Sequence, residues 1–244
     1  MYGARLRSLS VLTAVTLIAG YSLAAFYAPM DADQGFMQKI FYLHVPMAVV
    51  ALCGFVFGGI CAVQHLRTGD SRWDLRSYVA IHISVILGVG VLVTGSIWAR
   101  ASWGHWWVWD EPTLVSFLII FLLYATYTPL RFSIEDREKQ ARYASVFAVT
   151  AGAFVPLNFV AVRAATALVH PRTFDSASNL PGAFRTTFLV CLLGMALLYV
   201  TLWQYEMVHK NTTAQLRALK RKLGGDGDPA PPIRRSAAPE LQVR

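Results

Sequence analysis

The sequence predicts an all-α integral membrane protein built as a six-transmembrane-helix bundle. Of its 244 residues, 55% are hydrophobic and only 15% are charged, and the mean hydropathy is +0.45. These values exclude an ordinary soluble domain. The apolar residues also gather in runs of roughly 20, which is the length that crosses about 30 Å of hydrocarbon as a helix.

Six such runs account for most of the chain. They cover residues 9–28, 43–64, 79–98, 113–131, 143–162 and 183–205. The first follows Arg5 and Arg7, as a secretory signal would, but its apolar stretch is long for a signal and suits an anchor of the same orientation. In the second, Gly54-x-x-x-Gly58 indicates close helix packing.

The later runs carry polar or small residues with separate meanings. His82 lies inside the third run, where an ionisable side chain is either functional or a packed, hydrogen-bonded group. Pro156 and Asn158 interrupt the fifth run, and a kink is favoured there over a broken helix. Three cysteines fall inside the runs and are expected to pack as small apolar side chains: Cys53, Cys61 and Cys191.

The positive charges predict the orientation. If the N-terminus is cytoplasmic, 17 of the 22 lysines and arginines lie on the inside and five on the outside, as the positive-inside rule requires. Both termini are then cytoplasmic and the loop near 99–112 is external. The net charge of +8 is therefore mainly a topology signal, and no nucleic-acid partner is expected.

We expect two parts: residues 1–206 as the membrane domain, and residues 207–244 as a basic, partly disordered cytoplasmic tail. The tail carries leucines at helical spacing between Lys210 and Leu223. Two interpretations remain open for this stretch, a helix in solvent or on the lipid surface and a helix that docks on a partner subunit.

The external loop contains four of the seven tryptophans within seven residues: Trp103, Trp106, Trp107 and Trp109, followed by Asp110. A tryptophan ordinarily sits singly in the interfacial belt, so four together indicate a flat aromatic platform. If this segment is helical, Trp103, Trp106, Trp107 and Asp110 share one face.

Two histidines are expected at the outer membrane level, each next to a proline-restricted backbone. His44 begins the second run and His170 lies in the last external loop. Two imidazoles can serve as the axial ligands of a haem, whose own ring fills the equatorial positions, so the protein needs only an apolar, aromatic cleft besides. Four outer arginines can pair with propionates or with lipid headgroups: Arg100, Arg163, Arg172 and Arg185.

Two motifs are missing from the sequence. There is no Cys-x-x-Cys-His, so the chain is not itself a covalent c-type haem carrier. There is no Gly-x-x-x-x-Gly-Lys-Ser/Thr, so any ATP-driven step needs another subunit.

Taken together, Trp-Gly-x-Trp-Trp-x-Trp-Asp in an external loop, Phe-Tyr-Leu-His-Val-Pro before the second span and a later external histidine resemble the CcmC family. This family belongs to the tryptophan-rich "WWD" haem-handling superfamily, and the resemblance covers roughly residues 38–205. It implies non-covalent haem b against the tryptophan segment, ligated by His44 and His170. The surrounding candidates are Trp103, Trp106, Trp107, Trp109, Asp110, Arg100 and His105.

The resemblance further implies a haem-transfer protein rather than an enzyme. It would sit in the bacterial cytoplasmic (inner) membrane with its haem on the periplasmic side, in contact with membrane lipid. There it would load the haem chaperone CcmE during c-type cytochrome biogenesis, with the small subunit CcmD and the ABC transporter subunits CcmA and CcmB.

Three positions depart from the family pattern. His105 stands where the family usually has threonine. After Asp110 the family usually reaches an arginine within two residues, whereas this chain continues with Glu111-Pro112 and has no basic residue there. The second histidine of the family usually precedes Gln-Pro, whereas here Pro171 directly follows His170. These departures concern propionate pairing and chaperone contact and leave the general assignment in place. Two other functions also stay open: a b-type cytochrome subunit that exchanges electrons with quinone, and a haem-free membrane scaffold.

Overall fold

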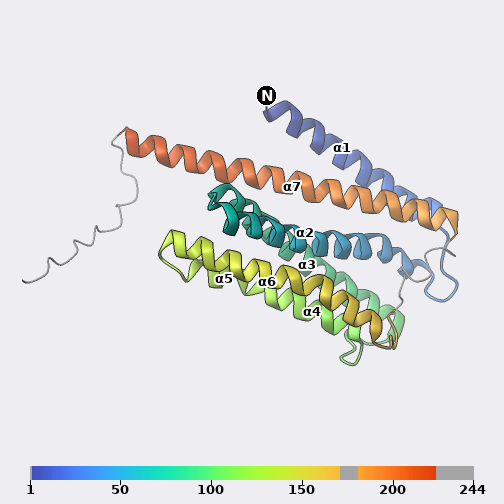
Figure 1. The fold of residues 1–244 in the computed structure, drawn as a ribbon. Coiled ribbons are helices and arrows are strands. Elements are labelled where there is room, and N and C mark those ends of the chain that lie inside the picture. The colour runs from blue at the N-terminus through green and yellow to red at the C-terminus, as the bar shows by residue number, and fades with distance from the viewer. Residues whose placement is uncertain (1, 171–180, 224–244) are drawn as a thin grey trace, which may run out of the picture. The chain divides into compact units, whose positions relative to one another are not determined.

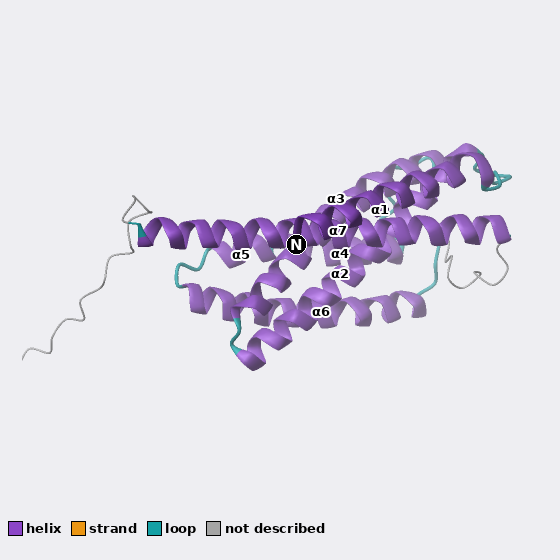
Figure 2. Cartoon of the chain, turned by 90° about the horizontal axis from the view of Figure 1, so that it is seen from above, coloured by secondary structure: helices purple, strands orange, loops and turns teal. Residues whose placement is uncertain are grey.

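The structure is a computed structural model that describes residues 2–170 and 181–223. In these ranges its regular secondary structure is helical throughout, with a single isolated bridge between Asp31 and Gly35 (Figures 1 and 2). Six helices in the described part are long and apolar enough to cross a membrane. The predicted all-α, multi-pass membrane fold is confirmed.

The helices follow one another with short connections. In chain order they are α1 Tyr2–Ser22, η1 Leu23–Tyr27, η2 Phe36–Ile40, α2 Phe41–Thr68, α3 Ser71–Trp103, α4 Pro112–Ala125, α5 Tyr127–Phe132, α6 Arg137–Ala164 and α7 Gly182–Lys222. Each predicted run overlaps one of the six spans, which reach beyond the apolar residues because polar side chains cap their ends. Asp70 accepts a hydrogen bond from the Arg72 N–H and starts α3, and Asp136 does the same for α6 with Lys139.

The chain divides into two compact units, residues 1–205 and 206–244. Helix α7 contributes to both. In the second unit the helix reaches Lys222, and Lys210 lies 3.8 Å from Glu206 in an i,i+4 ion pair. All features described below belong to the first unit.

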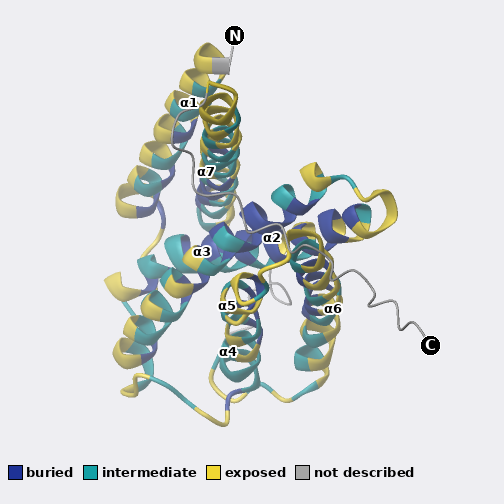
Figure 3. Cartoon of the chain, turned by 90° about the vertical axis from the view of Figure 1, so that its left-hand side faces the viewer, coloured by how far each residue is buried: buried dark blue, intermediate teal, exposed yellow. Residues whose placement is uncertain are grey.

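Helix α2 packs most extensively against α3 and α6, and the buried residues gather around it (Figure 3). Its glycines allow this approach. A Cβ atom on Gly58 would lie 2.7 Å from Cγ1 of Ile81, and one on Gly54 would overlap Ser84 and Tyr199. The close packing predicted for Gly54-x-x-x-Gly58 is confirmed, with α3 and α7 as the neighbours.

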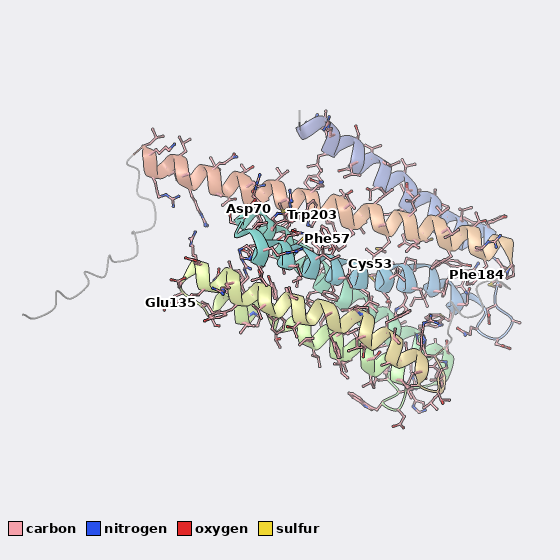
Figure 4. All side chains as sticks on the ribbon, viewed as in Figure 1. Cys53, Phe57, Asp70, Glu135, Phe184 and Trp203 are labelled. Atoms are coloured by element: carbon pink, nitrogen blue, oxygen red, sulfur yellow. The ribbon has the colours of Figure 1, made fainter. Side chains whose placement is uncertain are left out.

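Two predictions about individual side chains have different outcomes. Cys61 and Cys191 are buried as expected, but the prediction is wrong for Cys53, which is exposed on the surface of α2 (Figure 4). A small apolar thiol meets no penalty on a helix face that points toward lipid. Helix α6 runs through Pro156 without a break, so the broken-helix alternative is wrong.

One buried ion pair joins α3 to α5. The Arg131 guanidinium donates two parallel hydrogen bonds to the Asp74 carboxylate, at 2.7 and 2.6 Å, and a third to the Tyr127 hydroxyl at 3.2 Å. The side chains of Arg131 and Asp74 are only 10% and 12% exposed. A bidentate pair of this kind is strong, and its loss would leave one charge buried without a partner.

We expect Arg131→Met to lower the free energy of unfolding by about 3–5 kcal/mol, because the Asp74 carboxylate would stay buried without its partner. Chemical unfolding in detergent measures this. The control is Arg72→Met, since Arg72 is exposed and pairs with Asp70 at the surface. That change is expected to leave the free energy of unfolding close to the wild-type value, and equal losses in the two variants would contradict the prediction.

Candidate functional site

A partly open cavity lies at the end of the bundle that carries the tryptophan loop, which we define as residues 104–111 between α3 and α4. Side chains from α2, α3, α4 and α6 line it, and most of them are apolar. Its free space, including the open mouth, is about 1450 Å³. The polar and aromatic side chains in the lining include His44, His170, Trp98, Trp103, Trp107 and Arg163.

His44 lies in the first turns of α2 and is held by Thr94 of α3. Its Nδ1 is 2.9 Å from the Thr94 hydroxyl oxygen, and that hydroxyl donates to the Gly90 carbonyl at 2.7 Å. With the hydroxyl hydrogen donated to Gly90, the tautomer that satisfies both contacts carries its proton on Nδ1 and donates it to the Thr94 oxygen. The tautomer therefore leaves the lone pair on Nε2, which is the form of imidazole that binds a metal.

The backbone of α3 makes room for this imidazole. Gly95 has no side chain, and a Cβ atom there would lie 2.8 Å from Cε1 of His44. The Trp98 ring stands edge-on to the imidazole, with 5.9 Å between the ring centroids. His44 thus has its orientation fixed by one hydrogen bond and by close packing on a helix.

His170 lies in the irregular segment that follows α6. Its ring meets Trp103 edge-on at a centroid separation of 6.2 Å, and it lines the same cavity as His44. The fold therefore brings together two histidines that are far apart in the sequence.

The segment before His170 is fastened by Glu111, the residue just before α4. One carboxylate oxygen of Glu111 accepts hydrogen bonds from the main-chain N–H groups of Leu168, Val169 and His170, at 2.9, 2.8 and 3.2 Å. The other accepts from the N–H of Thr113 at 3.4 Å. We call the contact between Glu111 and residues 168–170 the Glu111 clamp.

The clamp determines the charge state of this buried acid. Glu111 is 0% exposed, and burial by itself raises the pKa of its carboxyl group. The main-chain N–H groups of Val169, His170, Leu168 and Thr113 lower it, and the net pKa lies below the ordinary value. The side chain is therefore a buried carboxylate anion at neutral pH.

The tryptophan segment is not a helix, so the prediction that Trp103, Trp106, Trp107 and Asp110 share one helical face is wrong. Helix α3 ends at Trp103 because Gly104 adopts a left-handed conformation with φ of 78°. Trp103 and Trp107 line the cavity, whereas Trp106 and Trp109 are 61% and 71% exposed. Trp107 and Trp109 remain in edge contact at 5.9 Å.

The other predicted site residues lie around the rim or elsewhere. His105 and Asp110 are exposed on the tryptophan loop and are not among the cavity-lining residues. His82 stacks on Tyr78 with the rings 6.0 Å apart and nearly parallel. This arrangement favours the packed interpretation of His82.

The outer arginines have different environments. Arg163 lines the cavity, with its guanidinium 4.7 Å above the Phe159 ring. Arg100 is exposed and donates to the Gly104 carbonyl, which ties down the end of α3. Arg185 is exposed at the start of α7, and Arg172 lies outside the described residues.

Comparison with known proteins decides the family. The CcmC family model, described as heme exporter protein C, matches residues 1–222. The chain belongs to the heme exporter protein C family. The match is longer than residues 38–205, over which the sequence motifs carried the resemblance.

Three relatives named heme exporter protein C show how far the similarity extends. The protein from Rhodobacter capsulatus is 27% identical over 213 residues, covering 86% of this chain and 88% of the relative. The protein from Bradyrhizobium diazoefficiens is 30% identical over 216 residues, covering 87% and 81%. The protein from Escherichia coli K12 is 28% identical over 199 residues, covering 82% and 80%.

Sequence reasoning missed three polar residues at the site of this heme exporter protein C family member. Gln34 accepts hydrogen bonds from the Trp98 indole N–H at 2.6 Å and from the Ser102 hydroxyl at 3.0 Å. Thr94 holds His44, and Glu111 was noted only because no basic residue follows it. The available signals were weak: for Thr94, a threonine between two glycines inside a span, and for Glu111, an acid directly after Asp110 and before a proline.

The lowered pKa of Glu111 makes one contribution to stability depend on pH. A carboxylate whose pKa is lower in the folded state stabilises the fold above its unfolded pKa, about 4.3, and loses that contribution as the pH falls through the folded pKa. We expect part of the wild-type decline in unfolding free energy below that pH to disappear in Glu111→Gln. Unfolding in detergent across a pH series measures this.

The matched control for the pH series is Glu135→Gln, because Glu135 is an exposed glutamate in the loop between α5 and α6. Its variant should follow the wild-type curve. Parallel curves for wild type and Glu111→Gln would show that the clamp carries no pH-dependent stability.

Proposed function

We propose that this protein binds haem b non-covalently on the outer face of the bacterial cytoplasmic membrane, with His44 and His170 as the axial ligands. We further propose that it delivers this haem to the chaperone CcmE during c-type cytochrome biogenesis. The observation that carries the proposal is that both histidines line one apolar cavity walled by tryptophans.

The residues present fit a haem. The tetrapyrrole supplies four equatorial nitrogens, so two imidazoles complete the coordination of the iron. Two protein ligands are then sufficient. Among the described residues, no group of three or more His, Cys, Asp or Glu side chains is arranged to hold a bare metal ion. Trp103 and Trp107 offer aromatic surface to the macrocycle, and Arg163 supplies a cation for a propionate.

Haem in this proposal is a cargo and not a resident cofactor, and the protein is a transfer protein rather than an enzyme. Trp103 and Trp107 in the cavity lining contact the cargo, whereas the exposed Trp106 and Trp109 present an aromatic surface to the chaperone. Arg100, His105 and Asp110 lie on or beside this loop and complete the rim of the site.

Membership of the family supports a place among other components of a haem export complex. We propose CcmD and the ABC transporter subunits CcmA and CcmB as the partners, because the sequence has no phosphate-binding loop of its own. We propose that both termini are cytoplasmic and that the tryptophan loop is periplasmic, because the distribution of lysines and arginines favours this orientation in the membrane.

The ligand assignment predicts the absorption spectrum. Detergent-purified wild type supplied with haem is expected to show a six-coordinate, low-spin spectrum, oxidised and reduced. His44→Ala and His170→Ala should each shift it toward high spin, with partial recovery on adding imidazole, and the double variant should lose the low-spin form. Haem transfer from wild type to purified CcmE is the next assay.

Three outcomes contradict the proposal in different ways. An unchanged low-spin spectrum in the double variant moves the ligands to other side chains. Reduction and reoxidation of the haem coupled to quinone favours a b-type cytochrome subunit. Absence of any Soret band in wild type after haem supply favours a haem-free scaffold.

The cavity position of Arg163 predicts a separate effect on affinity. Arg163→Gln should weaken haem binding roughly tenfold, because a charge-assisted bond to a propionate is lost, while the low-spin spectrum is kept. Haem titration measures both. The matched control is Arg137→Gln, an exposed arginine at the other end of α6; weakening in Arg100→Gln instead of Arg163→Gln would assign the propionate to Arg100.

A further inference from the structure

We infer that Glu111 is a positioning residue for His170, an inference that rests on the haem-binding function proposed above. Glu111 does not line the cavity. Its carboxylate acts on the main chain of the segment that carries His170, and it thereby sets where that imidazole stands relative to His44.

Main-chain N–H groups of the segment that follows α6 form an anion-binding site, and the carboxylate of Glu111 is the anion that occupies it. Three successive main-chain N–H groups, those of Leu168, Val169 and His170, converge on one carboxylate oxygen within 3.2 Å. Hydrogen bonds from three N–H groups to one charged oxygen are charge-assisted and together stabilise the anion. Complete burial of Glu111 keeps water from competing for these bonds.

The clamp joins parts of the chain that are 57 to 59 residues apart. On one side is the start of α4, where Glu111 also caps the helix through the Thr113 N–H. On the other side is irregular chain beyond the last α6 hydrogen bonds, which end at Ala165. Fixing irregular chain costs conformational entropy, and charge-assisted hydrogen bonds oppose that cost.

Glu111 acts on the imidazole of His170 directly through the main chain of that same residue. The N–H of His170 is itself a donor to Glu111, so the clamp fixes the main chain from which the imidazole projects. The ring then meets the edge of Trp103. His44 needs no such device because it is part of α2 and is held by Thr94.

The chemistry requires both the charge and the length of glutamate. Glutamine keeps the length but is neutral, and its amide N–H₂ would face a main-chain N–H at one of the two oxygen positions. Aspartate keeps the charge but is one methylene shorter. We therefore expect Glu111→Gln to loosen the clamp and Glu111→Asp to retain part of it.

The first measurement needs no haem. Hydrogen–deuterium exchange of the apoprotein in detergent reports the amides of Leu168, Val169 and His170. In Glu111→Gln these amides are expected to exchange about tenfold faster or more, because they lose a charged acceptor. Glu135→Gln is the control, because Glu135 is exposed in the loop between α5 and α6 and lies at the opposite end of the bundle from Phe184 in the first turn of α7 (Figure 4). That variant should match wild type.

The second measurement is haem titration with absorption spectra. Removing an outer-shell partner of a metal ligand typically weakens binding 10- to 100-fold, and we expect a loss of roughly that size in Glu111→Gln, with part of the haem becoming high-spin. Added imidazole should restore the low-spin form, which a general loss of fold would not allow. In a His170→Ala background the substitution should have no further effect on the spectrum.

The outcomes separate this inference from the proposed function. Unchanged exchange at residues 168–170 in Glu111→Gln overturns the clamp. Faster exchange with wild-type affinity and spectrum overturns its role in positioning His170. Wild type that binds no haem, or a His170→Ala variant with an unaltered spectrum, overturns the proposed function, and the positioning role falls with it even where the exchange difference stands.

Discussion

The hydrocarbon interior of a membrane offers no hydrogen-bond partner to a peptide group, and this constraint governs the whole structure. The six spans satisfy it by being helical over almost their whole length, with one turn residue, Thr126, between α4 and α5 in the fourth span. At the tryptophan-loop end of the bundle, charged side chains form hydrogen bonds with main-chain N–H and C=O groups at and beyond the helix ends. Arg100 donates to the Gly104 carbonyl, Lys39 donates to the Ala28 carbonyl, and Glu111 accepts from the chain before His170. The candidate site lies where irregular backbone is permitted and stabilised.

The two histidines at this site are held by different means. His44 stands on a central helix, with its tautomer set by Thr94 and its space provided by Gly95. His170 stands on a short irregular segment whose main chain is fastened by a buried carboxylate. The main chain of His44 therefore moves only with helix α2, whereas the main chain of His170 is freed when the hydrogen bonds to Glu111 break. In the proposed transfer of haem, such asymmetry would allow His170 to be released without repacking the bundle.

The four clustered tryptophans divide into two pairs rather than forming one platform. Trp103 and Trp107 line the cavity, and Trp106 and Trp109 are exposed. The division follows from the left-handed Gly104, which ends α3 and lets successive rings point in different directions. Arg163 brings a positive charge to the cavity from α6.

Local patterns in the sequence were enough to predict six helical spans, the close packing at Gly54 and Gly58, and the family, because hydropathy, glycine spacing and a dense tryptophan motif are properties of neighbouring residues. Helix ends were predicted less well, since Asp70 and Asp136 extend α3 and α6 through polar residues. Only the tertiary structure decided that His44 and His170 line one cavity and that Glu111 fastens a segment 57 residues away. Such contacts depend on how the helices pack, and no local pattern records which distant main-chain groups will meet a buried carboxylate.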